Sequence, residues 1–225
     1  MFEKEGFFNA EEFWKMAGYT ALDYRTYKDL EHPSKDFYSL TSLLDNKPEY
    51  VNFEGFLFPD TYFIPQNISP KGVIELMIKN LDEKITVKMR EDIKESGKTF
   101  FDIIIMASIL ENEAITFKDK KIVSGLLWKR LEEGMPLQVD ATLQYFTGKN
   151  TFQLTLEDLD LDSPYNTYEY KGLPLGPITN PGIWSIKAAI YPEESPYWFY
   201  LSDKESIIHY SETFEEHKAK KFKYL

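Results

Sequence analysis

The sequence predicts an α+β fold, in which a helical N-terminal half packs on a smaller C-terminal part made of strands and loops. Apolar residues recur at spacings of three and four along most of residues 69 to 133, which is typical of amphipathic helices. Residues 135 to 183 are rich in Pro, Gly, Asn and Tyr, a composition that favours loops. The tail alternates like two short strands joined by a turn.

The first predicted element is a short helix over residues 9 to 30, capped by Asn9 with Glu12 at capping-box spacing. A turn-rich joint at residues 45 to 52 separates it from an aromatic segment, residues 53 to 65. Two prolines in that segment argue against one regular element. Three helices follow, and their expected bounds are Ser69 or Pro70 to about Glu95, Thr99 to the carboxylates described below, and about Lys118 to Glu133.

Beyond residue 134 the predicted elements are short. An extended stretch at residues 135 to 145 would place Gln138, Asp140 and Thr142 on one side, where they could bind a polar substrate or form the wet face of an edge strand. The later elements are a helical turn near residues 155 to 161, a helix over 183 to 189, strands over 197 to 202 and 207 to 211, and a helix from 213 to about 222.

Composition excludes several classes of function. The net charge of −11 argues against a sequence-independent nucleic-acid binder and against a polybasic membrane surface. The absence of cysteine excludes thiol catalysis, disulfides and thiolate metal sites. No run approaches the length of a membrane-spanning helix, and the first residues lack the apolar core of a signal peptide, so the chain as written is expected to be soluble.

The segment richest in chemical information is the apolar run over residues 103 to 110, which ends in Glu111 and Glu113. A carboxylate beside an apolar wall tends to hold its proton, because desolvation disfavours the charged form, and a general acid needs that property near neutral pH. Residues two apart on a helix point about 200° from each other. The pattern does not decide which glutamate enters a cleft, and it is also compatible with two solvated carboxylates at a helix end.

A further group of polar side chains lies in the loops that follow. Residues 172 to 182 contain six Gly and Pro residues, which fix an irregular loop that could shape a site. Asn166, Tyr168 and Asn180 are the polar groups that this region could present. The histidines match no spacing of metal ligands, so we expect them to be structural or surface residues and expect no metal site.

Taken in order along the chain, these segments resemble those of the YceG-like endolytic murein transglycosylases, also called MltG. The resemblance covers roughly residues 50 to 217. The matching pieces are residues 54–62 (EGFLFPDTY), 107–114 (ASILENEA), 130–138 (RLEEGMPLQ) with Asp140, Thr142 and Tyr145, 165–168 (YNTY), 172–174 (GLP), 176–178 (GPI), 180–182 (NPG), and the tail residues His209, Glu216 and His217.

The resemblance implies an enzyme that cleaves the β-1,4 bond between N-acetylmuramic acid and N-acetylglucosamine inside peptidoglycan strands, without hydrolysis, and leaves 1,6-anhydro ends. The family's catalytic glutamate falls on Glu113. It would protonate the leaving oxygen and then act as base on the sugar's own C6 hydroxyl, and no cofactor is implied. The enzymatic alternative is a muramidase that hydrolyses the same bond, and the non-enzymatic one is a peptidoglycan-binding domain.

Other residue roles implied by the resemblance rank below that of Glu113. Glu111 is expected to support it, either by orienting it or by raising its pKa through like charge. Substrate-binding roles are expected for the following residues, which would line a groove between the helical and the strand-and-loop parts: Gln138, Asp140, Tyr145, Tyr165, Asn166, Tyr168, Asn180 and His209.

The resemblance also implies a domain division and a location. Residues 49 to 225 would form the catalytic domain, and residues 1 to 48 a short helical remnant of the region that precedes it. Peptidoglycan glycan strands are the expected partner, with cell-wall synthases as candidate protein partners and no nucleic acid. The expected location is the cell envelope, at the outer face of the cytoplasmic membrane, with a membrane anchor present only in the full-length protein.

Overall fold

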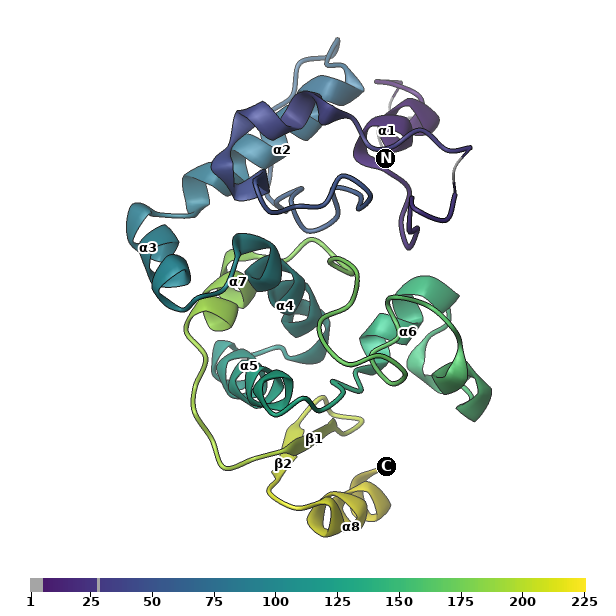
Figure 1. Ribbon diagram of the computed structural model, residues 1–225, viewed down its shortest axis with the longest axis vertical. Coiled ribbons are helices and arrows are strands. Elements are labelled where there is room, and N and C mark those ends of the chain that lie inside the picture. Colours follow the sequence, from purple (N-terminus) through teal and green to yellow (C-terminus); the bar gives the residue numbers. More distant parts are fainter. Residues whose placement is uncertain (1–5, 28) are drawn as a thin grey trace.

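A computed structural model describes residues 6–27 and 29–225 and confirms the predicted α+β class. Figure 1 shows the elements stacked along the long axis, with α1 and α2 at one end, α4, α5 and α7 in the middle, and a hairpin with α8 at the other end. The helices are α1 (Ala10–Ala17), α2 (Pro70–Lys84), α3 (Val87–Glu95), α4 (Phe100–Glu113), α5 (Phe117–Glu132), α6 (Asp140–Thr147), α7 (Ile183–Ile190) and α8 (Phe214–Tyr224).

The N-terminal segment packs on the rest of the chain. Asn9 caps α1 as predicted, and its side chain accepts a hydrogen bond from the Glu11 amide, but the helix ends at Ala17 and does not reach residue 30. The short 3-10 helices η1 (Lys35–Leu40) and η2 (Ser42–Leu44) follow. Their buried residues Phe37 and Leu44 belong to the same hydrophobic cluster as Phe53, so residues before and after position 48 share one core.

The prediction of one long helix from residue 69 to residue 95 is wrong, because this part of the chain forms two helices, α2 and α3. The chain leaves helical geometry at Ile85, and Thr86 then begins α3 as its cap, with its side chain accepting a hydrogen bond from the Met89 amide. A threonine in extended geometry satisfies a free amide of the first turn, and this local bond stabilises a new helix start.

The centre of the fold is α4, which begins at Thr99 as predicted. Thr99 and Asp102 form a reciprocal capping box. Nearly every side chain from Phe100 to Leu110 is buried, since α7 and α5 pack against this helix. A helix that is apolar on all sides belongs inside the protein. The buried part of α4 thus holds the two glutamates of its last turn in a fixed position at the edge of the core.

The prediction of an extended stretch at residues 135 to 145 is also wrong, because α6 begins at Asp140. Gln138 has a positive φ of 54° and turns the chain into this helix, while the Thr142 hydroxyl donates to the Val139 carbonyl at 2.7 Å. Thr142 is buried against Thr167. Gln138, Asp140 and Thr142 therefore do not share one face of a strand.

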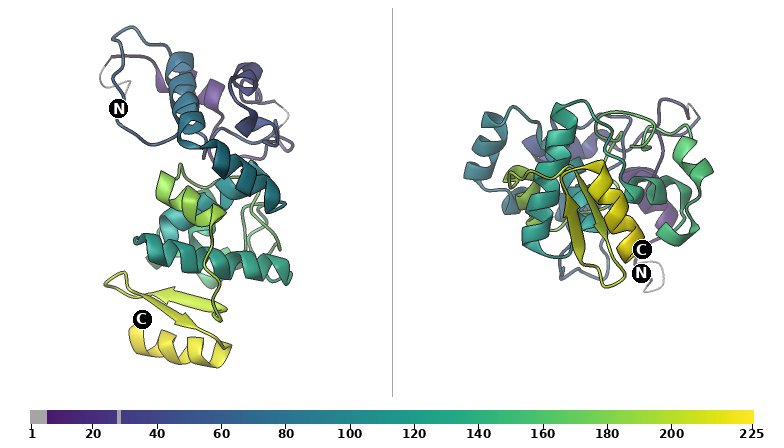
Figure 2. Two further views of the ribbon diagram at one scale, coloured as in Figure 1. Left: turned by 90° about the vertical axis from the view of Figure 1, so that its left-hand side faces the viewer. Right: turned by 90° about the horizontal axis from the view of Figure 1, so that it is seen from below.

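The predicted hairpin and tail helix are confirmed with slightly different bounds. Strands β1 (Phe199–Ser202) and β2 (Ile208–Ser211) pair antiparallel, with Tyr200 opposite Tyr210 and Leu201 opposite His209. Figure 2 shows α8 lying along the hairpin at one end of the molecule. No helix in the described part of the chain combines the length and the apolar character that crossing a bilayer requires.

Candidate active site

A cavity of about 940 Å³ opens where the end of α4 meets α6, the hairpin and α8. Five of the residues singled out from the sequence line it: Glu113, Gln138, Asp140, Tyr145 and Tyr168. The elements around it come from both the helical part and the C-terminal hairpin. The cavity thus lies where a groove between these two parts was expected.

Glu113 is the acidic residue at the end of α4 that reaches this cavity. The Tyr200 hydroxyl, on β1, donates a hydrogen bond to its Oε2 at 2.7 Å. Burial and the nearby charge of Asp140 raise the pKa of Glu113 to about 7, although the bonds from Tyr200 and the Ala141 amide act in the opposite direction. A carboxyl group with such a pKa is half protonated at neutral pH and can both give and take a proton.

Asp140 is the second carboxylate of the cavity, and it lies in the first turn of α6. The Tyr168 hydroxyl donates to its Oδ1 at 2.5 Å. Burial, followed by the charge of Asp140, raises the pKa of Tyr168 well above its usual range. Tyr168 therefore remains a hydrogen-bond donor that holds Asp140 in place near Glu113.

Tyr145 lines the cavity with its ring, but its hydroxyl is engaged elsewhere. That oxygen accepts hydrogen bonds from the Ala21 amide at 3.0 Å and from Asn52 Nδ2 at 3.3 Å. Gln138 is exposed at the cavity wall. Of these two residues, Gln138 presents the freer polar group, while Tyr145 ties the N-terminal segment to α6.

Four predicted substrate-binding positions lie outside the cavity, and the first two are core residues. Tyr165 is fully buried, and Asn166 donates to the Leu159 and Leu161 carbonyls at 2.9 and 2.8 Å. Both side chains lie inside the protein, because residues 163 to 168 fold inward as a turn, and neither lines the cavity.

Asn180 and His209 also have structural partners. The Asn180 side chain accepts from the Gly55 and Leu57 amides and donates to Glu54, which joins two loops far apart in sequence. His209 pairs with Asp203 at 2.7 Å across the hairpin turn and stacks on Tyr224. The histidine that lines the cavity is His217, on α8.

Glu111 points to the opposite side of α4 from Glu113. It pairs with Lys120 Nζ at 3.2 Å and accepts hydrogen bonds from the Ser185 hydroxyl and, at 3.3 Å, from the Gly182 amide. Burial acts to raise the pKa of Glu111, but the Ser185 bond and the Lys120 charge outweigh it and lower the pKa. The like charge that raises the pKa of Glu113 comes from Asp140, so the expectation that Glu111 supplies it is wrong.

The cavity also contains residues to which the sequence assigned no role. Tyr200 is the hydrogen-bond donor to Glu113, while Arg130 and Lys221 add positive charge to the wall. Alternation in the tail predicts a strand around Tyr200, but it gives no sign that this strand returns to α4, 87 positions earlier in the chain. This pairing is a tertiary contact without a local signal.

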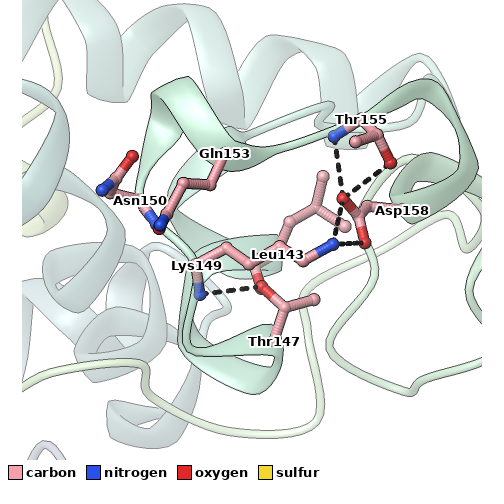
Figure 3. A network of polar contacts seen from close by, with 7 residues as sticks. All are labelled: Leu143, Thr147, Lys149, Asn150, Gln153, Thr155 and Asp158. Carbon is pink, nitrogen blue, oxygen red and sulfur yellow. Dashed lines mark hydrogen bonds and ion pairs between the residues drawn. The ribbon is translucent and has the colours of Figure 1, made fainter.

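One wall of the cavity continues from α6 into a small polar lobe, residues 148 to 160. Figure 3 shows Lys149 reaching Asp158, and the ion pair measures 2.5 Å. The Thr155 amide and hydroxyl also donate to Asp158. Asp158 thus neutralises Lys149, and the lobe is held together by its own hydrogen bonds.

Comparison with known proteins shows the family. The model of the YceG-like family matches residues 7–223. The chain is 34% identical to the endolytic murein transglycosylase of Bacillus subtilis over 83% of its length, and 30% identical to that of Streptococcus pneumoniae strain R6 over 73%. It covers 52% and 31% of those proteins, so it spans about half the length or less of the curated relatives it matches.

A solved structure agrees with this result. A crystal structure of a putative yceG-like protein from Listeria monocytogenes matches 93% of this chain and 66% of that one, with a TM-score of 0.75 and 34% identity. The family model covers every residue that lines the cavity except Leu225. The chain belongs to the YceG-like family.

Proposed function

We propose that this chain is the catalytic part of an endolytic murein transglycosylase, with Glu113 as its acid and base. The observation that carries the proposal is a carboxyl group whose pKa is raised to about 7 in a cavity of about 940 Å³. The Bacillus and Streptococcus relatives are named endolytic murein transglycosylases, which supports the same activity. The substrate would be a peptidoglycan glycan strand, which implies work at the cell envelope.

The reaction needs only one residue that exchanges protons. Glu113 gives its proton to the glycosidic oxygen as the bond from C1 of N-acetylmuramic acid breaks. The carboxylate then takes the proton of the C6 hydroxyl while O6 bonds to C1. This step closes the 1,6-anhydro ring and restores protonated Glu113. The C6 hydroxyl is held within the same sugar, so the step is intramolecular and gains from proximity.

Asp140 gives a specific reason to consider the hydrolytic alternative. It is a second carboxylate in the same cavity, and its charge acts on Glu113. In a muramidase, such a group would activate a water molecule against C1. In a transglycosylase, Asp140 instead maintains the pKa of Glu113 and can accept a hydrogen bond from a sugar hydroxyl or amide.

The nature of the released ends decides between these functions. We expect wild-type protein to release fragments with 1,6-anhydro ends from intact sacculi, each lighter by one water than a reducing-end fragment, as read by mass spectrometry. Reducing ends would identify a muramidase and overturn the transglycosylase proposal. Binding to sacculi without any released fragment would leave only the binding-domain alternative.

Two substitutions beside Glu113 are expected to shift its pKa in opposite directions. Tyr200→Phe removes a hydrogen bond that favours the ionised form and so raises the pKa, while Asp140→Asn removes a like charge and so lowers it. Protonated Glu113 is the active acid, so kcat/KM falls as pH rises through that pKa. We expect the alkaline limb of the pH–rate profile to move to higher pH in Tyr200→Phe and to lower pH in Asp140→Asn. Shifts in the same direction would contradict the assignment.

A further inference from the structure

A second cavity, of about 440 Å³, lies on the other side of the last turn of α4. Its lining residues are Glu111, Ile115, Phe117, Lys120, Gly182 and Trp184. Trp184 is 58% exposed and Ile115 is 77% exposed, so two large apolar side chains are open to solvent at the same cavity. The cavity thus combines an open aromatic surface with a half-buried charged pair.

Two chain segments connect this cavity with the one that contains Glu113. The last turn of α4 places Asn112 and Glu113 in the first cavity and Glu111 in the second. The loop of residues 178 to 182 also borders both cavities, because Ile178 lines the first cavity and Gly182 lines the second. Asn112, which lies between the two glutamates and lines the first cavity, is exposed, so the two cavities border the same solvent-exposed helical turn.

The aromatic surface has a defined arrangement. Phe117 packs against Trp184 with ring centres 5.1 Å apart, and Lys187 Nζ lies 5.1 Å from the centre of the Trp184 ring. The indole is thus supported by neighbours and remains more than half exposed. Broad, rigid aromatic rings of this kind offer apolar contact area to a flat ligand at a low cost in side-chain entropy.

Glu111 supplies a polar acceptor beside these rings. Among the described residues, the hydrogen bonds to Glu111 from Lys120, Ser185 and Gly182 all end on Oε2. Oε1 therefore remains available to accept a hydrogen bond from a ligand, and the lowered pKa of Glu111 keeps it ionised. An apolar ring face next to a fixed acceptor suits a sugar, which has C–H faces and hydroxyl or amide donors at its rim.

We propose that the second cavity is a distal sugar-binding subsite, in which Trp184 and Glu111 bind a glycan strand that continues from the cleavage position at Glu113. The inference rests on the proposed function and deepens it. An enzyme that cuts inside a strand must hold sugars on both sides of the reacting bond, and binding at a distance from that bond can position it. Trp184 acts as a positioning residue.

Strand-length dependence of binding tests the proposal. In a Glu113→Gln background, which stops turnover, affinity is measured by calorimetry for peptide-free glycan strands of two lengths, one that fills only the first cavity and one several repeats longer. Trp184→Ala is expected to weaken binding of the long strand about tenfold, in the range found for aromatic contacts, and to leave the short strand unaffected. Trp184→Tyr keeps a ring and should restore most of the affinity.

Phe63→Ala is the matched control, because Phe63 is 99% exposed and lines neither cavity. If Trp184→Ala changes long-strand affinity no more than this control, or weakens both strands equally, the subsite proposal is overturned. Unchanged binding of the long strand by Trp184→Ala would instead indicate that this surface binds a protein partner. Digestion of sacculi by protein with intact Glu113 tests the proposed function separately, since turnover there does not depend on the strand-length comparison.

Discussion

Replacement of Glu113 by Gln is expected to lower the rate of strand cleavage about a thousandfold or more, within the range of general acid–base contributions. Glutamine has nearly the shape of the protonated acid, so it can keep a hydrogen bond with Tyr200, but it cannot give a proton to the leaving oxygen or take one from the C6 hydroxyl. Strand binding should persist. The measurement is the release of soluble fragments from sacculi together with a pull-down of the same sacculi.

Glu91→Gln provides the control, since Glu91 is exposed on α3 and lines neither cavity. This variant should cleave at the wild-type rate. Cleavage by Glu113→Gln at a similar rate would show that Glu113 is not the acid. If Glu113→Gln loses binding as well as cleavage, Glu113 is needed to hold the strand. That result would contradict its proposed role in proton transfer alone.

The same substitution has an expected effect on stability, which confirms that the variant is folded. The folded-state pKa of Glu113 is raised from 4.5 to about 7, so between these values the folded state binds more protons than the unfolded state. The contribution of Glu113 to stability is therefore lost as pH rises through this window. Glutamine does not ionise, so Glu113→Gln should melt above the wild type at pH 8 and close to it at pH 4.

Replacement of Arg130 by Met is expected to destabilise the fold by about 2–3 kcal/mol, because it strands buried carbonyl groups. Arg130 is only 5% exposed. Its guanidinium donates to the Trp198 carbonyl at 2.9 Å and to the Leu137 carbonyl at 2.8 Å. It thus fastens the start of the hairpin to α5 and to the loop before α6. Removal of the buried guanidinium charge, which is unfavourable to desolvate, offsets part of this loss of stability.

A fall in melting temperature of roughly 5–10 °C is the expected readout of Arg130→Met for a chain of this size. The melting temperature of Arg130→Lys should lie between those of the wild type and Arg130→Met, because a single ammonium group cannot reach both carbonyls as the planar guanidinium does. Lys35→Met is the control, since Lys35 forms an exposed pair with Glu49 and such pairs contribute little. Equal melting temperatures for Arg130→Met and Lys35→Met would refute this role.

Local signals in the sequence identified most of the helices. Asn9 and Thr99 cap α1 and α4 at the expected positions, because a cap needs only residues within one turn. The apolar character of α4 likewise predicted its burial. The same logic failed at Thr86, where a helix cap lies within a continuous amphipathic pattern, and at Asp140, where three alternating polar residues imitate a strand.

The sequence by itself determined the fold class and the carboxylate at the end of an apolar helix, since both follow from periodicity and the composition of neighbours. It could not assign different surroundings to Glu111 and Glu113. Tertiary structure decided that difference, because Ser185 is 74 positions from Glu111 and Tyr200 is 87 positions from Glu113. One carboxylate is paired with a lysine and stays ionised, and the other is desolvated beside Asp140, which raises its pKa to about 7. Packing of α5, α6, α7 and the hairpin around the end of α4 creates that asymmetry, and no local pattern encodes it.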